Sequence, residues 1–130
     1  TPVFEDVQMG LSTGLALNGF VSVSCYPRFD FLILACNQLV SHLDKIEYMS
    51  KGKMKPRVII RTSIGPKTPL DGGPQHTADY TESFKAMLTN TKVVSLNEPE
   101  EIFPAYEEAL LGDEYHSTLI IENGGHYNDK

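Results

Sequence analysis

Residues 57–64, RVIIRTSI, constrain the fold more than any other stretch, because their apolar residues run consecutively instead of alternating. A strand of this kind is buried on both faces, as in a parallel sheet covered by helices. Parallel strands need long crossover connections, which are usually helices. The segment therefore predicts an α/β fold.

The rest of the chain repeats this alternation of strands and helices. We expect residues 1–4 to be the end of a strand, with further strands at 20–25, 92–96 and 117–122, and helices at 6–18, 29–49, 81–88 and 99–111. Pro104 should kink the last helix or mark its true start. The prediction is an open, mostly parallel sheet with helices on both faces, formed by residues 1–122, and a frayed C-terminal tail at 123–130.

Length and charge limit the classes of function. The 130 residues are enough for one domain or part of one, and the net charge of −6 argues against nucleic acid or an acidic membrane as partner. The longest apolar run, residues 31–36, is far too short to span a bilayer. Cys25 and Cys36 lack metal-site spacing, and no secretory segment is recognised. We therefore expect reduced thiols, no metal site and a cytoplasmic protein.

Three polar or aromatic stretches follow predicted strands. Glu5 comes after the first, residues 26–29 (YPRF) after the second, and a loop at 64–76 with three prolines and three glycines after the third. Loops at the carboxyl ends of parallel strands meet ligands in open α/β sheets. We expect these three stretches to converge along one edge of the sheet.

Each candidate in these stretches also has an ordinary structural explanation. Glu5 could simply favour a helix N-terminus through the macrodipole, although Asp6 is equally well placed for that task. Tyr26 and Phe29 could pack into the core or offer a flat ring to a heteroaromatic ligand. His76 could be an idle loop residue or an acid or base. No Walker loop, GxGxxG fingerprint or GxSxG elbow is present.

The order of three motifs resembles a known family. Residues 1–17, TPVFEDVQMGLSTGLAL, are similar to the TPxxExxxxGxxxGxA segment of thiamine-diphosphate enzymes of the transketolase superfamily. Residues 25–52 are similar to the family's aromatic block, its A-x-[DN]-Q element and YMSGG, and residues 61–76 to its strand, loop and Gln-His element. The resemblance is closest to the beta subunit of the decarboxylating component of 2-oxo acid dehydrogenases such as pyruvate dehydrogenase.

The resemblance implies a pyrimidine-binding domain for thiamine diphosphate. Glu5 would hydrogen-bond the aminopyrimidine and favour its imino form, Phe29 would stack on the ring with support from Tyr26, and His76 would face a small 2-oxo acid. The GDG…N motif for diphosphate and magnesium is absent from the chain, so a diphosphate-binding alpha subunit or domain would supply it, in a homo- or hetero-oligomer.

The family's strand and helix before TPxxE are also missing from the sequence, and we expect the chain alone to be inactive. A close transketolase-like enzyme is a neighbouring interpretation of the same motifs. The alternative from another class is a non-catalytic α/β interaction module that keeps the fold and pairs with a partner without turnover.

Overall fold

The computed structural model describes residues 3–114 and 116–128. Its strands are β1 (Ser22–Tyr26), β2 (Val58–Ile64), β3 (Lys92–Leu96) and β4 (Thr118–Asn123). They form one sheet in the order β1-β2-β4-β3, and every neighbouring pair is parallel. The predicted α/β fold with a parallel sheet is confirmed.

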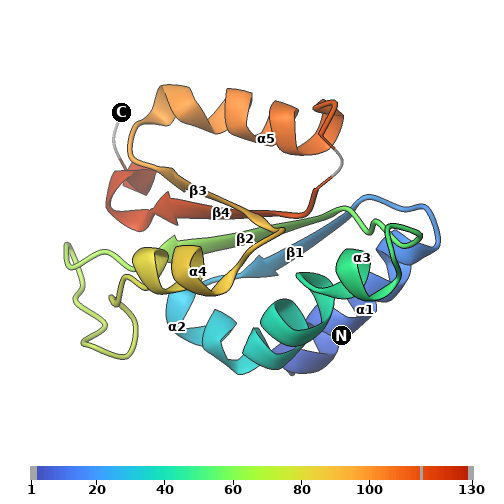
Figure 1. Ribbon diagram of the computed structural model, residues 1–130. Helices are drawn as coiled ribbons and strands as arrows, with labels where there is room; N and C mark the ends of the chain where they lie inside the picture. The colour runs from blue at the N-terminus through green and yellow to red at the C-terminus, as the bar shows by residue number, and fades with distance from the viewer. Residues whose placement is uncertain (1–2, 115, 129–130) are drawn as a thin grey trace.

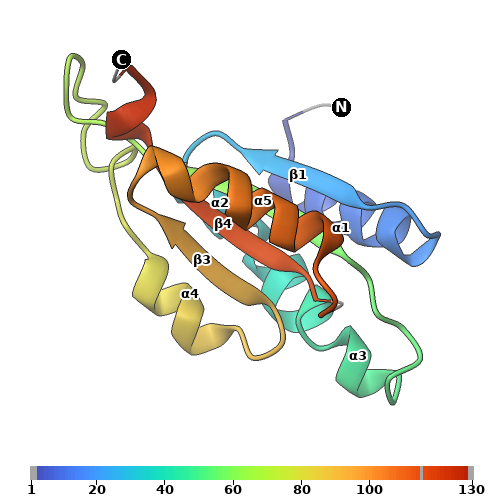
Figure 2. The same cartoon turned by 90° about the horizontal axis from the view of Figure 1, so that it is seen from above.

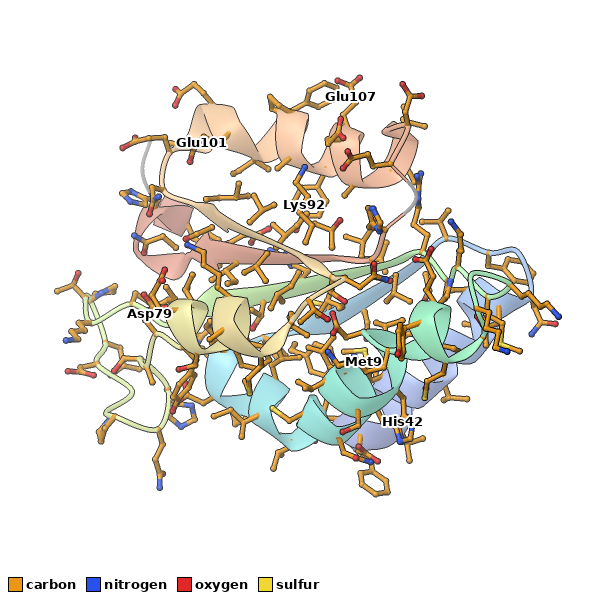
Figure 3. The ribbon with its side chains drawn as sticks, in the orientation of Figure 1. Met9, His42, Asp79, Lys92, Glu101 and Glu107 are labelled. Atoms are coloured by element: carbon orange, nitrogen blue, oxygen red, sulfur yellow. The ribbon has the colours of Figure 1, made fainter. Side chains whose placement is uncertain are left out.

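Helices cover both faces of this sheet, as Figure 1 shows. α1 (Glu5–Leu17), α2 (Phe29–Leu32), α3 (Ile46–Met49) and α4 (Thr81–Met87) lie on one side, and α5 (Ile102–Leu111) lies on the other. The α1 side holds the larger core, which includes the completely buried Met9, labelled in Figure 3 between the helices and the sheet. Under α5 a smaller core forms around Ile59 and Ile120.

The predicted continuous helix at 29–49 is wrong. After α2 the chain forms a 3₁₀ turn at Ile33–Ala35, a π-helix at Asn37–Leu43 and then α3. The buried side chains explain the change, because they recur every three residues at first and every four residues afterwards: Phe29, Leu32, Ala35, Leu39 and Leu43. A 3₁₀ helix has three residues per turn, and a π-helix has more than four. The change in residues per turn therefore keeps this row of apolar side chains against the sheet.

The two chain ends also differ from expectation. Val3 and Phe4 are not in a strand, and Phe4 is the N-cap of α1, while residues 1–2 lie outside the described part. Residues Gly124–Asn128, expected to be frayed, form the 3₁₀ helix η4. Tyr127 in η4 turns back and donates a hydrogen bond to Glu122. Residues 129–130 lie outside the description.

Pro104 marks a helix start and does not break a helix. A short 3₁₀ turn, η3 (Pro99–Glu101), precedes α5, and Pro104 occupies the first turn of α5. The first N–H groups of a helix have no intrahelical acceptor, so the missing N–H of proline costs little there.

Two buried charges fasten the amino ends of the strands. Asp44, whose side chain is 0% exposed, accepts hydrogen bonds from the backbone N–H groups of residues 89–91, which lead into β3. Arg57, just before β2, donates to the carbonyl groups of Leu110, Gly112 and Glu114, which lead toward β4. These contacts hold the segments entering β2, β3 and β4 at that edge.

Within the described residues no helix is long and apolar enough to cross a membrane. Both cysteines are free thiols, as expected. The cytoplasmic location stays a prediction.

Candidate functional site

The carboxyl ends of all four strands lie toward one edge of the sheet, together with the loop after β2 and with η4 (Figures 1 and 2). The start of α1 lies at the same edge, since the Gln8 amide donates to the carbonyl of Cys25 near the end of β1. The predicted convergence of the three stretches on one edge is therefore present. This edge is the candidate site.

Glu5 is the first residue of α1, and its side chain is half-buried. Together with Asp6 it places negative charge in the first turn, where the helix dipole favours it. No donor to its carboxylate is found among residues 3–114 and 116–128, in contrast to the carboxylate of Asp44. The Glu5 carboxylate therefore keeps its acceptor capacity for a ligand or for water.

Tyr26 ties the end of β1 to Glu5. Its hydroxyl donates to the backbone carbonyl of Glu5 at 3.3 Å and accepts from Ser24 at 3.2 Å. Gln8 extends the chain of hydrogen bonds by donating to the Ser24 hydroxyl. Burial, with the nearby carboxylates of Glu5 and Asp6, raises the pKa of Tyr26 to about 12, against the opposing hydrogen bond from Ser24. Tyr26 is therefore a neutral hydroxyl near pH 7 that fixes the backbone carrying Glu5.

Phe29 lies in the core. It is completely buried, and its ring contacts Phe84 at a centroid distance of 5.1 Å and Tyr80 edge-on at 5.6 Å. The ring has no exposed face in this structure, and Tyr26 is almost as fully buried. The sequence left open whether these two aromatic rings pack into the core or face a ligand. In this structure they pack into the core.

His76 lies within the loop that joins β2 to α4 and packs edge-on against Phe31, with ring centroids 5.6 Å apart. Both side chains are only partly buried. Gly65 is required for this arrangement, because a Cβ there would lie 1.8 Å from the carbonyl oxygen of His76. Within the described residues, no hydrogen bond or ring contact joins His76 to Glu5. The structure thus brings Glu5 and Tyr26 together, and separately His76 and Phe31.

A charged network on the α5 side was missed from the sequence. The Arg61 guanidinium donates to both carboxylate oxygens of Glu122, at 2.9 and 2.7 Å, and the hydroxyls of Tyr106 and Tyr127 donate to the same carboxylate. Burial favours the neutral form of Glu122, but Arg61 and the two hydroxyls outweigh it and lower the pKa. Arg61 stands within a strand that the sequence predicts to be buried, and a buried arginine needs a partner of opposite charge. This feature of the sequence could have predicted the ion pair.

No group of three or more His, Cys, Asp or Glu residues in the described part of the chain could hold a metal ion.

The chain is similar in sequence to one part of 2-oxo acid dehydrogenase beta subunits. It is 33% identical over 110 residues to the 3-methyl-2-oxobutanoate dehydrogenase subunit beta of Mycobacterium tuberculosis, a match covering 85% of this chain and 31% of that protein. It is 27% identical over 123 residues to the mitochondrial pyruvate dehydrogenase E1 component subunit beta of Ascaris suum, covering 95% of this chain and 33% of the relative.

A third relative is the 2-oxoisovalerate dehydrogenase subunit beta of Bacillus subtilis, which is 25% identical over 105 residues, covering 81% of this chain and 30% of the relative. No protein-family model matches the chain. The chain thus spans about a third of the length of these relatives. The predicted family resemblance is confirmed, and the parallel α/β fold agrees with a transketolase-like pyrimidine-binding domain.

Proposed function

We propose that this chain is the pyrimidine-binding half-site of a thiamine-diphosphate-dependent 2-oxo acid dehydrogenase beta subunit, or of a close transketolase-like enzyme. One observation carries the proposal: a half-buried carboxylate, Glu5, stands at the carboxyl edge of the sheet on backbone held by Tyr26, and no donor among the described residues uses its acceptor capacity. The similarity to beta subunits supports the same conclusion.

In this proposal Glu5 accepts a hydrogen bond from the cofactor's aminopyrimidine and thereby favours one tautomer of that ring. The bound cofactor supplies the carbon nucleophile and electron sink for 2-oxo acid decarboxylation. Tyr26 acts as a positioning residue, since its hydroxyl bonds the Glu5 carbonyl. His76 handles a proton or polar group of the substrate.

The aromatic residues fit a bound pyrimidine only in part. Phe29 is enclosed by Tyr80 and Phe84, so stacking directly on a ligand would require this cluster to repack. Without repacking, Phe29 supports the wall of the site from behind. The partly exposed pair Phe31 and His76 forms the wall that a ligand can reach.

A partner completes the proposed site. A diphosphate-binding alpha subunit or domain holds the diphosphate and supplies protein ligands for magnesium, which needs several oxygen ligands. The groove along the exposed face of α1 is the proposed association surface, and it is lined by Val7, Gly10, Leu11, Gly14, Leu15 and Phe20. Its four large apolar side chains are each at least two-fifths exposed in the single chain. Their burial by a partner would give a homo- or hetero-oligomer.

The decisive experiment compares Glu5→Gln with Asp6→Asn. The two residues are adjacent carboxylates in the same first turn, so both substitutions remove one charge from the same helix end. The chain is combined with a diphosphate-binding alpha subunit from the same organism, thiamine diphosphate and Mg²⁺. Reduction of an artificial electron acceptor is measured with pyruvate and with 3-methyl-2-oxobutanoate.

We expect Glu5→Gln to lower kcat by at least about a hundredfold, the lower range for loss of a proton-transfer group, and Asp6→Asn to stay within about threefold of the parent, since it costs only helix-dipole energy. Equal activity of the two variants would refute the role of Glu5. A stable complex without turnover in the parent chain would favour the non-catalytic interaction module.

A further inference from the structure

A small cavity opens between the ends of β1 and β2, on the face of the sheet that α5 shares. Its volume is about 140 Å³, and its lining includes Cys25, Arg28, Arg61, Ser63 and Tyr127. Cys25 and Arg61 are register partners whose side chains point away from the face on which Tyr26 contacts Glu5, but Tyr26 also lines the cavity, which therefore adjoins the proposed cofactor site. Neither Glu5 nor His76 lines the cavity, so anion binding here does not depend on the proposed cofactor chemistry.

Two guanidinium groups reach this cavity, and their charges are balanced differently. Arg61 forms a two-bond ion pair with Glu122. Arg28 has no carboxylate within 4.0 Å among the residues that the structure describes. One nitrogen, Nη1, donates to the Pro27 carbonyl at 2.7 Å and, at 3.5 Å, to the hydroxyl of Ser63. Both acceptors are neutral, so the half-buried charge of Arg28 is left without a counter-charge.

The surroundings of Arg28 hold it at the cavity. Ser63 is 3% exposed, and its hydroxyl donates to the same Pro27 carbonyl that accepts from Arg28. On the other side lies Gly65, where a Cβ would stand 3.1 Å from Nε of Arg28. The absence of a side chain at Gly65 therefore leaves room for the guanidinium, which lies between the end of β2 and its own turn.

We propose that this cavity binds a small carboxylate or phosphate anion through Arg28. A guanidinium presents its N–H donors in a planar fork that matches the oxygens of both anions, and such charge-assisted hydrogen bonds are stronger than neutral ones. Arg61 lines the second wall of the cavity, but Glu122 balances its charge, so Arg28 supplies the positive charge. This positive charge is confined to the cavity, whereas the chain as a whole carries a net charge of −6.

The test titrates the full chain with sodium phosphate, acetate and pyruvate at constant ionic strength, by isothermal titration calorimetry and thermal melting. We expect at least one of these anions to bind and to raise the Tm. Arg28→Gln should weaken binding at least about tenfold, as expected for loss of a charge-assisted hydrogen bond. The matched control is Lys67→Gln, which removes one positive charge from an exposed position in the nearby loop and should leave binding unchanged.

Arg28→Lys keeps the charge without the fork, so its affinity should fall between those of the parent and Arg28→Gln. It also tests the site if Arg28→Gln does not fold. Phosphate binding without acetate or pyruvate binding assigns the site to phosphate, and the reverse assigns it to carboxylates. No binding of any anion to the parent, or equal losses in Arg28→Gln and Lys67→Gln, would overturn the proposal.

Discussion

The charged residues at the two ends of the sheet differ in burial and in hydrogen bonding. At the amino ends of the strands, Asp44 and Arg57 are buried, and each forms several hydrogen bonds with backbone groups of neighbouring segments. At the carboxyl ends, Glu5 and Arg28 are only half-buried, and within the described residues neither has an ionic partner. The carboxyl edge also holds the Arg61–Glu122 pair, whose charges balance each other, but Glu5 and Arg28 there stay accessible, unlike Asp44 and Arg57 at the amino edge.

This difference follows from the course of the chain. The segments entering β3 and β4 must be fixed to their neighbours, and a buried charge that accepts or donates several backbone hydrogen bonds does this well. The carboxyl edge of an open α/β sheet is where ligands bind, so a charge satisfied there by the protein itself would be lost to function. The contrast predicts large stability effects for Asp44 at the amino edge and small ones for Glu5 and Asp6 at the carboxyl edge.

Replacing Asp44 should have the largest effect on stability. Asp44→Ala leaves the N–H groups of residues 89–91 without their acceptor and removes the partner of Lys45. We expect the free energy of unfolding to fall by about 3–5 kcal/mol, the range for breaking a buried charge network. Urea denaturation measures this, with the exposed Glu107→Ala as control (labelled on α5 in Figure 3). A change below 1 kcal/mol would remove the contrast between the two edges.

The same carboxylate should make stability fall at low pH. Burial alone would raise the pKa of Asp44, but the Lys45 ammonium and the N–H groups of residues 89–91 outweigh it and hold the pKa well below its usual range. Its contribution is therefore fully present above the unfolded pKa of about 3.9 and is lost as pH falls further.

Denaturation of the parent chain between pH 4 and 2 should show an extra slope from this one group of up to about 1.4 kcal/mol per pH unit. That slope should be absent from Asp44→Asn. Equal slopes in the two proteins would contradict the role given to Asp44.

The smallest effects are expected at the carboxyl edge. Glu5→Gln and Asp6→Asn should each change the unfolding free energy by no more than about 0.3–1 kcal/mol, because each loses only an interaction with the helix dipole. Thermal melts of both variants beside the parent check this. A much larger loss in Glu5→Gln alone would mean that Glu5 serves the fold, and it would weaken the catalytic proposal.

Strand positions could be predicted from the sequence because apolar runs and β-branched residues report burial directly. The strand predicted at 92–96 has those bounds in the structure, and the other three internal strands are displaced by one or two residues at most. Residues 29–49 were mispredicted because a helix of constant pitch was assumed. The three-then-four spacing of Phe29, Leu32, Ala35, Leu39 and Leu43 contained the signal for the change of pitch.

The candidate site was predictable only at the level of loops. Parallel topology implies that Glu5, Tyr26 and His76 share one edge, but no sequence pattern states that Phe29 faces the core while Phe31 contacts His76. Which of the two rings faces the core depends on the backbone conformation of the turn after β1. Arg28 was passed over for a related reason: its importance lies in the missing counter-charge around it, and this is visible only once distant segments are placed together.

The strand order has a consequence for the synthesis of the protein. Among the described strands β4 is made after the other three, yet it lies between β2 and β3, and it pairs with β2 residues about sixty positions earlier in the chain. Until β4 leaves the ribosome, β2 and β3 lack their shared neighbour and expose unpaired backbone. The sheet must therefore close late, through long-range contacts that form slowly. A nascent chain that stalls before Thr118 would present two open strand edges to chaperones and proteases.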